Sequence, residues 1–423
     1  MRELERRYPA ELVVIGVHSG KYHAERVTGR IRDASLRLGA THPVVNDRQF
    51  RIWRSYAVAA WPTLVVIDPA GKVVGSHAGE FAADMLVPFI DGLIAAAQAS
   101  DTLDVRPIHF EPDQPGIAPG LLRYPGKVSV DGNRIAISDS GNHRVLIGSL
   151  SDDRMRMTVT RTVGGAEPGF ADGLAPLFNS PQGLLFSGDT LYVADSGNHS
   201  VRTIDVGTGR TATLVGTGRQ LRSESDREAG SLSSPWDLTL VEGILFIAMA
   251  GAHQLWSFEV NTRTLRVHSG SGGEDIRDGG HRDALLAQPM GIVPAGNRLY
   301  FADSESSAIR WADTAVDGAI HTLVGTGLFD FGNADGTGDE VLMQHQQGVA
   351  LHTSGRLLIA DSYNDSIKWL DPATRLATTW VRGLHEPGGV ACAGRVACVA
   401  DTNAHRIATI NYETGALGDL AVA

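Results

Sequence analysis

The sequence predicts a mainly β protein in which an α/β domain precedes a six-bladed β-propeller. One pattern recurs six times between residues 121 and 423: an apolar run, a turn, a second apolar run and a turn that usually contains Asp. The first hundred residues lack this repeat and alternate β-branched apolar runs with segments of helical spacing. Residues 101–120 contain four prolines, which is typical of a connector. We therefore expect domains at 1–100 and 121–423, joined by a linker at 101–120.

The first domain is predicted to contain a strand, a helix, two further strands and a second helix. Residues 11–17 contain a continuous apolar, β-branched run, the pattern of a strand that is buried on both faces. Apolar residues recur at helical spacing over 27–38 and again over 81–97. A second apolar run at 63–67 leads into a turn that returns the chain as a hairpin at 72–74. This order is typical of a layered α/β domain.

Three runs in this domain, ELVVIGVHSGKYHAE, HPVVND and WPTLVVIDPAGKVVG, resemble the thioredoxin-like domain that is fused to NHL repeats in a family of bacterial and animal proteins. The resemblance implies that Trp61, Pro62 and Thr63 form the family's cis-proline loop, which faces a CxxC-type motif. It also implies that the family's first strand and cysteine motif precede the segment that begins here at Met1. We therefore expect a partial domain, which reflects either a start codon placed too late or a truncated or degenerate paralogue.

The missing cysteines limit what this domain can do. Residues 1–391 contain no cysteine, and thiol–disulfide exchange requires a thiolate. A thiol–disulfide oxidoreductase is therefore the alternative function only if the true start lies upstream. A sheet that lacks its first strand exposes an unpaired edge. Self-association through that edge is expected.

The six repeats align on the residue before the first apolar run. This residue is Pro in five copies and Gln in one: Pro125, Pro181, Pro235, Pro289, Gln346 and Pro387. The later turn reads Asp-Ser-Gly-Asn-His from Asp139 and from Asp195, and it begins at Asp303, Asp361 and Asp401 in three other copies. The third copy departs from the pattern and reads Met249-Ala250-Gly251-Ala252-His253. The signature resembles that of NHL repeats, whose six sheets stack around an axis because each is apolar on both faces.

The residues that follow the aligned position vary where their neighbours repeat. They begin the innermost strand of each blade, so they are expected to ring one mouth of the central channel, where propellers bind ligands. The candidate channel-mouth site contains Lys127, Gln182, Trp236, Asp237, Met290, His345 and Gln347. The alternative is that these residues pack the loops and bind no ligand.

Neither the cysteines nor the repeated histidines predict a metal or redox site. Cys392 and Cys398 fall on adjacent strands of the sixth blade, where inert thiols are favoured over a disulfide. Histidines occupy the fifth position of four turns, but equivalent positions on neighbouring sheets lie ~10 Å or more apart, beyond the reach of a shared metal. A turn-stabilising role is therefore expected. No cofactor and no metal are expected.

The charge and the hydropathy of the sequence restrict the possible partners and the location of the protein. Residues 1–100 carry 12 basic and 10 acidic residues, whereas the rest carry 25 and 38 and are strongly acidic. This balance disfavours nucleic acid as a partner. The sequence shows no signal peptide or membrane-spanning run, so a cytoplasmic protein is expected. The leading hypothesis is a non-catalytic scaffold that binds a protein or small molecule at a propeller face. A propeller lactonase, lyase or hydrolase with a channel-mouth site is the other alternative.

Overall fold

The computed structural model describes residues 1–79, 81, 83–106, 108, 110–111, 113 and 120–423. It divides into two compact units, Met1–Gly116 and Ile117–Ala423. Much of the expected linker at 101–120, namely 107, 109, 112 and 114–119, lies outside the described residues.

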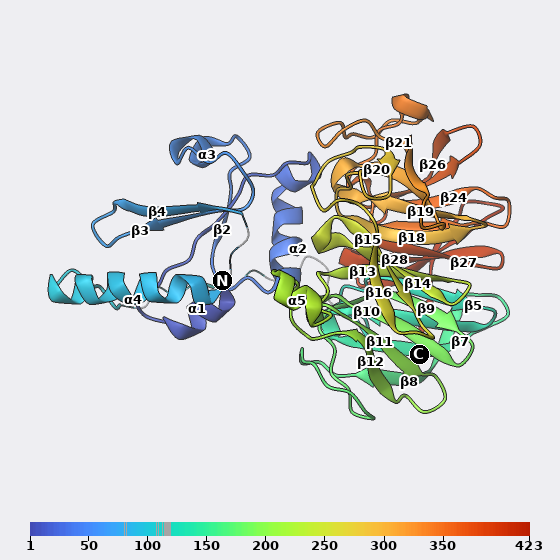
Figure 1. Cartoon of the computed structure of the whole chain (residues 1–423), viewed down its shortest axis with the longest axis horizontal. Helices are drawn as coiled ribbons and strands as arrows, with labels where there is room; N and C mark the ends of the chain where they lie inside the picture. Colours follow the sequence, from blue (N-terminus) through green and yellow to red (C-terminus); the bar gives the residue numbers. More distant parts are fainter. Residues whose placement is uncertain (80, 82, 107, 109, 112, 114–119) are drawn as a thin grey trace. The chain divides into compact units, whose positions relative to one another are not determined.

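The first unit is an α/β domain with two separate small sheets (Figure 1). Its elements are α1 (Arg2–Arg7), β1 (Gly16–His18), η1 (Ala24–Arg26), α2 (Thr28–Leu38), β2 (Val44–Asn46), α3 (Arg51–Ser55), β3 (Thr63–Ile67), β4 (Val73–Ala78) and α4 (Ala83–Ala99). Strands β1 and β2 are parallel, whereas β3 and β4 form the expected antiparallel hairpin. Helix α2 ends at Gly39, which takes the left-handed conformation. Leu4 and Tyr8 of the first helical segment pack with Ile90 of α4.

The expectation of a buried strand over residues 11–17 is wrong. Only Gly16–His18 forms a strand, and the β-branched side chains of Val13, Ile15 and Val17 are 49%, 57% and 43% exposed. In the described part of the chain β1 pairs only with β2, so no second neighbour covers this run. The sequence pattern is that of an interior strand, but this strand lies at an edge.

The second unit is a propeller of six antiparallel sheets (Figure 1). Blade 1 contains β5 (Val128–Asp131), β6 (Arg134–Asp139), β7 (Arg144–Leu150) and β8 (Arg156–Gly164). Blade 2 contains β9 (Pro181–Ser187), β10 (Thr190–Asp195), β11 (Ser200–Asp205) and β12 (Thr211–Gly216). Blade 3 contains β13 (Pro235–Val241), β14 (Ile244–Met249), β15 (Gln254–Glu259) and β16 (Thr264–Ser269).

Blades 4 to 6 repeat this order. Blade 4 contains β18 (Pro289–Ala295), β19 (Arg298–Asp303), β20 (Ala308–Asp313) and β21 (Ala319–Val324), with β17 (Gly279–Gly280) outside β21. Blade 5 contains β23 (Gly348–Leu351), β24 (Leu357–Asp361), β25 (Ser366–Asp371) and β26 (Leu376–Arg382), with β22 (Gly336–Thr337) outside β26. Blade 6 contains β27 (Pro387–Ala393), β28 (Val396–Asp401), β29 (Arg406–Asn411) and β30 (Leu417–Asp419). A short helix, α5 (Glu224–Glu228), lies between blades 2 and 3.

The ring is closed by the C-terminal end of the chain. Strand β31 (Ala421–Val422) runs parallel to β8 as a fifth strand of blade 1. The N–H of Ala421 donates to the carbonyl of Met155 at 2.9 Å, and the N–H of Val159 donates to that of Ala423 at 2.7 Å. Apolar clusters fill the spaces between neighbouring sheets. Between blades 1 and 2, for example, Ile147 packs with Leu191 and Ile204.

A buried aspartate organises the second turn of five blades. One carboxylate oxygen of Asp195 accepts the N–H of Asn179 at 2.8 Å, and the other is 2.9 Å from Arg202. Equivalent backbone donors serve Asp139, Asp303, Asp361 and Asp401. Blade 3 replaces this pair with apolar groups, because Met249 stands at the Asp position and Trp256 at the Arg position. The two changes occur together, so neither a carboxylate nor a guanidinium is left buried without its partner.

In blades 2 and 4 the arginine joins two carboxylates, whereas blade 5 uses a lysine. Arg310 lies 2.9 Å from Asp303 and 3.0 Å from Asp278. Lys368 lies 2.6 Å from Asp335, the counterpart of Asp278, and makes no ion pair with Asp361 in the described structure. Burial raises the pKa of Asp361 to about 7. A single ammonium group thus serves one of the two carboxylates that a forked guanidinium serves in blade 4.

Hydrogen bonds between successive turns join the blades. A turn hydroxyl donates to the carbonyl at the aligned position of the next blade in five seams: Ser140 to Pro181, Ser196 to Pro235, Ser304 to Gln346, Ser362 to Pro387 and Thr402 to Pro125. The fifth turn residue accepts an N–H of the next blade in the same five: His143 from Ser180, His199 from Ser234, Ser307 from His345, Asp365 from Glu386 and His405 from Tyr124. Three of the four repeated histidines therefore connect neighbouring blades.

The seam between blades 3 and 4 lacks both of these hydrogen bonds. Ala250 has no hydroxyl, and the buried Nδ1 atom of His253 has no hydrogen-bond partner in the described structure. Two other histidines act here. His268 donates from Nε2 to the carbonyl of Asp313 at 2.9 Å, and the hydroxyl of Ser269 is 2.7 Å from Nδ1 of His281. Burial lowers the pKa of His268 to about 4, so the ring is neutral at physiological pH.

Replacing Lys368 with arginine is expected to stabilise the propeller. The guanidinium can reach both Asp335 and Asp361, as Arg310 reaches both carboxylates of blade 4, and each added charge-assisted hydrogen bond contributes about 1.5–3 kcal/mol. Thermal unfolding of Lys368→Arg should show a higher Tm, and the reciprocal Arg310→Lys variant should show a lower one. An unchanged Tm for both variants would contradict this account of the clamp.

The propeller is expected to lose part of its stability in acid through His268. Because its folded pKa is about 4 and its ordinary value is 6.5, the unfolded state binds more protons between these pH values. The stabilisation is complete above pH 6.5 and disappears as the pH falls towards 4. The His268→Gln variant should lose this contribution, so its Tm difference from wild type should shrink as the pH falls. His321→Gln, at an exposed position of β21, serves as the matched control.

Candidate functional site

The innermost strands approach one another closely at the channel mouth. A Cβ atom added at Gly389 would lie 2.7 Å from the side chain of Lys127, and one added at Gly183 would lie 2.6 Å from the Cα of Asp237. Glycine at this position in four blades therefore leaves room for the side chains that the other two blades direct towards the axis. The inner strands approach so closely that only two blades can carry a large side chain at this position. This explains why the residue is Lys127 or Asp237 in two blades and glycine in the other four.

Lys127 bridges the propeller at this mouth. Its Nζ atom donates to the carbonyl of Met290 in blade 4 at 3.0 Å and also to the carbonyl of Gln347 in blade 5. It lies 3.4 Å from a carboxylate oxygen of Asp237 in blade 3. Only 5% of the lysine side chain and 15% of the aspartate side chain are exposed. A residue of blade 1 thus contacts three blades on the other side of the ring.

The ammonium group of Lys127 and the carboxylate of Asp237 stabilise each other although both are largely buried. Burial lowers the pKa of Lys127, and the nearby carboxylate opposes that change. Burial raises the pKa of Asp237, and Lys127 opposes it. Asp237 also accepts the backbone N–H of Leu238 at 3.0 Å and that of Ile292 at 3.4 Å. These contacts use the polar atoms of both side chains inside the protein.

The other residues of the predicted channel-mouth site differ in how deeply they are buried and in what they contact. Gln182 is half-buried against Gly126, whose added Cβ would meet its side-chain oxygen at 2.1 Å. Trp236 is half-buried, and its Nε1 atom is buried without a hydrogen-bond partner in the described structure. His345 is buried, and its Nε2 atom lies 3.7 Å from Glu305 while its ring meets Tyr363 edge to face. The ring therefore leaves Gln182, Trp236 and the side chain of Gln347 as the partly accessible groups.

The two cysteines lie apart in blade 6. Cys392 pairs across the hairpin with Ala397, and Cys398 pairs with Ala391, so the cysteines are diagonal neighbours. They pack into different apolar clusters on the two faces of the sheet, and both thiols are free. Burial raises the pKa of Cys398 to about 12 and also raises that of Cys392. Neither thiol is poised as a nucleophile.

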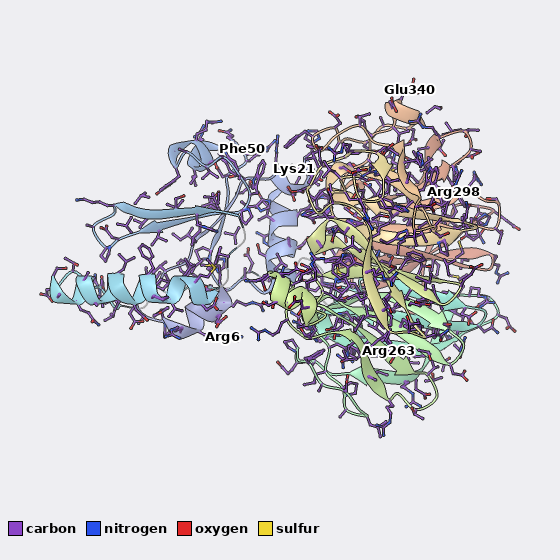
Figure 2. All side chains as sticks on the ribbon, viewed as in Figure 1. Arg6, Lys21, Phe50, Arg263, Arg298 and Glu340 are labelled. Carbon is purple, nitrogen blue, oxygen red and sulfur yellow. The ribbon has the colours of Figure 1, made fainter. Side chains whose placement is uncertain are left out.

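The predicted cis-proline loop lies at an aromatic surface of the first unit. The Trp61–Pro62 peptide bond is cis. Trp61 is 48% exposed, donates from Nε1 to the carbonyl of Ser19 at 2.7 Å, and packs on Trp53 with ring centres 4.6 Å apart. Phe50, labelled in Figure 2, meets both tryptophans edge to face. The carboxylate of Asp47 accepts the hydroxyl of Ser19 and holds the N-terminal turn of α3.

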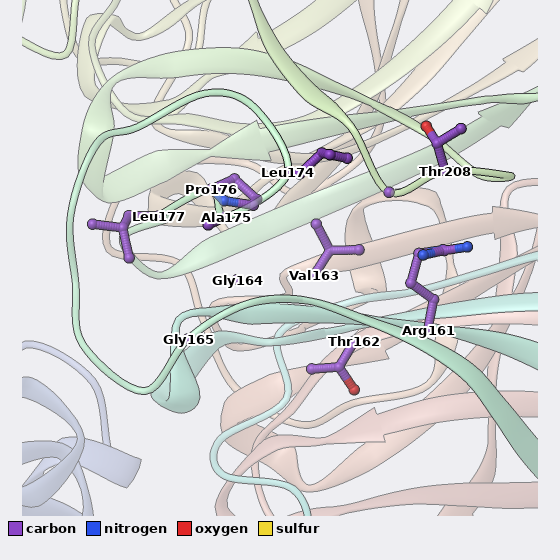
Figure 3. Close-up of a pocket in the computed structure, with 11 residues that line it drawn as sticks. Arg161, Thr162, Val163, Gly164, Gly165, Leu174, Ala175, Pro176, Leu177 and Thr208 are labelled. Carbon is purple, nitrogen blue, oxygen red and sulfur yellow. The ribbon is translucent and has the colours of Figure 1, made fainter.

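A cleft that the sequence did not predict lies between blades 1 and 2 (Figure 3). Its volume is about 310 Å³. The strand residues Arg161, Thr162 and Val163 form one wall, and the loop from Leu174 to Leu177 forms another. Its walls come from two blades, which only the tertiary structure brings together.

The fold and this axial geometry define an NHL-repeat β-propeller. The NHL repeat family matches residues 122–147 and 178–204. The chain is homologous to NHL repeat-containing protein 2: it is 35% identical to the Homo sapiens protein over 95% of this chain and 62% of that protein. It is 37% identical to the Arabidopsis thaliana protein SUPPRESSOR OF QUENCHING 1, chloroplastic, over 97% of this chain and 42% of that protein. The chain thus spans less than two thirds of these relatives.

Structural similarity is more distant. A chain of the nidogen/laminin complex aligns with 67% of this chain and 92% of its own length, at 15% identity and a TM-score of 0.49. Within the described residues, no helix is both long enough and apolar enough to cross a membrane.

Removing the ammonium group at the channel mouth is expected to destabilise the propeller strongly. Lys127→Met leaves the Asp237 carboxylate buried without its opposite charge and two carbonyls without their donor, a loss that costs about 3–5 kcal/mol. Adding Asp237→Asn removes the uncompensated charge and should restore part of the stability. Chemical denaturation of the two variants measures the difference. If Lys127→Met unfolds like the wild type, the axial pair does not support the ring.

Proposed function

We propose that this chain is a non-catalytic scaffold that binds a protein or small molecule at the propeller face where the channel mouth opens. The supporting observation is the Lys127 bridge, which uses the strongest polar groups of the mouth to hold four blades together. A rigid ring then presents the half-buried side chains of Gln182, Trp236 and Gln347 around the Lys127 bridge. Such a frame suits binding of a preformed partner surface.

The donor set argues against a metal-dependent lactonase, lyase or hydrolase at the mouth. Such a site needs several carboxylate or imidazole ligands that converge on one point. The predicted ring supplies one carboxylate, Asp237, which already pairs with Lys127. Among the described residues, no three His, Cys, Asp or Glu side chains come together as a metal site.

The thiol–disulfide alternative depends on residues that this chain does not contain. The aromatic surface beside Trp61 and Pro62 could receive a peptide, but no cysteine lies in residues 1–391. Cys392 and Cys398 are in the propeller core and have raised pKa values. The alternative stays a prediction for a longer form of the protein, and a cytoplasmic location stays a prediction as well.

Self-association through the first unit is a second proposed interaction. In the described structure β3 pairs only with β4, so one edge of the five-residue apolar strand Thr63–Ile67 has no strand beside it. Val17 and Val45 are paired across β1 and β2 and are 43% and 40% exposed. An apolar edge without charged residues favours strand pairing with another chain.

Substituting Trp236 is expected to remove partner binding while the fold is retained. Trp236→Ala deletes a half-buried aromatic side chain, and aromatic anchors commonly contribute about 2 kcal/mol or more to an interface. Cross-linking followed by mass spectrometry should show partner contacts in the wild type that disappear in the variant at unchanged Tm. Val316→Ser, an 84% exposed position at the opposite end of the strands, is the matched control. Contacts that persist in Trp236→Ala but vanish in Val316→Ser would place the interface on the other face.

A further inference from the structure

A basic side chain joins neighbouring blades at the outer rim in four seams. In three of them it is an arginine that donates to backbone carbonyls of the adjacent blade: Arg161 to Val206 and Gly207, Arg263 to Leu214, and Arg375 to Leu323. In the seam between blades 3 and 4 it is His268, which donates to the carbonyl of Asp313 at 2.9 Å. An arginine keeps its charge at every pH at which proteins fold, whereas a histidine titrates. Among these four seams, this one alone has a rim contact that depends on protonation.

The position of His268 is apolar in three other blades. His268 is the bulged residue of its outer strand, which leaves it without a partner across the sheet. The bulged residue of the outer strand is Leu214 in blade 2, Leu323 in blade 4 and Trp380 in blade 5. These three side chains pack into the apolar clusters that join each blade to the next. The seam between blades 3 and 4 therefore has a titratable ring where three other seams have apolar side chains.

A second histidine completes this rim contact. The connection between blades 3 and 4 brings His281 against His268, with ring centres 4.4 Å apart. Nε2 of His281 donates to the carbonyl of Ala315 at 2.9 Å, and its Nδ1 accepts the hydroxyl of Ser269 at 2.7 Å. The two histidines together fasten the outer strand of blade 3 to the turn at residues 314–318 of blade 4.

The hydrogen bonds of the two rings require both to be neutral. Each ring donates from Nε2 to a carbonyl, so an added proton would have to occupy Nδ1. In His281 that atom already accepts the hydroxyl of Ser269, and for His268 the described structure shows no acceptor at Nδ1. His281 is 4% exposed and His268 is half-buried. One proton would therefore place a poorly solvated charge in the seam, and two protons would place like charges side by side.

The charged groups around the pair do not offset this cost. Burial has the largest effect, and it lowers the pKa of His268 to about 4 and lowers that of His281 as well. The carboxylates of Asp313 and Asp317 face the rings from blade 4 and favour the protonated forms, but less strongly than burial opposes them. The pair is therefore neutral at physiological pH and takes up protons in acid only if the rings are released.

The rest of the seam is held at the axis. The two turn-to-turn hydrogen bonds of the other five seams are missing here, because Ala250 has no hydroxyl and Nδ1 of His253 has no partner in the described structure. At the axis, Lys127 contacts both Asp237 of blade 3 and the carbonyl of Met290 of blade 4. The axial end of the seam is thus fixed by charged groups, whereas the rim is joined by neutral histidines.

We propose that the rim of the seam between blades 3 and 4 is an acid-sensitive latch, which opens when His268 and His281 are protonated. The opened rim uncovers the apolar cluster that contains Phe246 and Leu286, which are 1% and 0% exposed in the closed ring. The contacts of Lys127 keep the axis closed, so the opening is local and the propeller is retained. The latch is separate from the proposed scaffold site at the channel mouth, and its test needs no partner.

Hydrogen–deuterium exchange of the full chain at pH 5 and pH 8, corrected for the intrinsic exchange rates, tests the latch. Because the pKa of His268 is about 4 in the closed rim and 6.5 when the ring is released, opening should be about thirtyfold more frequent at pH 5 than at pH 8. The protection of residues 264–270 and 314–318 should fall by about that factor. The outer strands of the arginine-joined seams, residues 156–164 and 211–216, should keep their protection.

Two variants and a control assign the pH dependence to the pair. His268→Leu installs the side chain that blades 2 and 4 carry at this position, so it should fold and lose most of the pH dependence. His281→Gln can still donate to the carbonyl of Ala315 and should also reduce the dependence. His321→Gln, at an exposed position of β21, should behave like the wild type. The proposal is overturned if the seam is equally protected at both pH values, if residues 211–216 lose as much protection, or if His268→Leu keeps the full pH dependence.

Discussion

The propeller depends on the buried aspartate that opens the second turn in five of its six blades. It accepts the N–H that leads into the innermost strand, and in most blades it pairs with a base from the third strand. In blade 2 these are Asp195, Asn179 and Arg202. A carboxylate in the core is costly unless both oxygens are satisfied, so the turn, the inner strand and the third strand must form together. This requirement makes each repeat a cooperative unit.

Where a blade lacks the aspartate or its arginine, the neighbouring residues change as well. These paired changes account for the differences between the six blades. Blade 3 exchanges the carboxylate and the guanidinium for Met249 and Trp256, so no charge is stranded. The same blade loses both turn-to-turn hydrogen bonds with blade 4, and His268 joins that seam to the carbonyl of Asp313. Blade 5 keeps its aspartate but replaces arginine with Lys368, which pairs with Asp335 and makes no ion pair with Asp361 in the described structure. Local chemistry varies while the sheet geometry is retained.

Equivalent positions of the six blades make different polar contacts. The loops that clamp the outer strands of blades 2, 4 and 5 use Asp-Gly pairs. At the axis Lys127 pairs with Asp237 and donates to carbonyls of two other blades. A repeated frame can thus carry different polar contacts at equivalent positions.

Periodicity in the sequence was sufficient to predict six stacked sheets, because the apolar runs recur in every copy and the Asp-containing turn recurs in five. It also placed Lys127 and Asp237 at one mouth. It could not show that Lys127 reaches carbonyls two and three blades away, since that contact depends on how closely the glycines let the inner strands approach. The run at residues 11–17 was misread as a buried strand, because burial depends on neighbours that a local pattern does not specify. The sequence determined the elements and their repetition through side-chain chemistry, whereas the tertiary structure decided which polar groups are used and which remain open, because this depends on distances between blades.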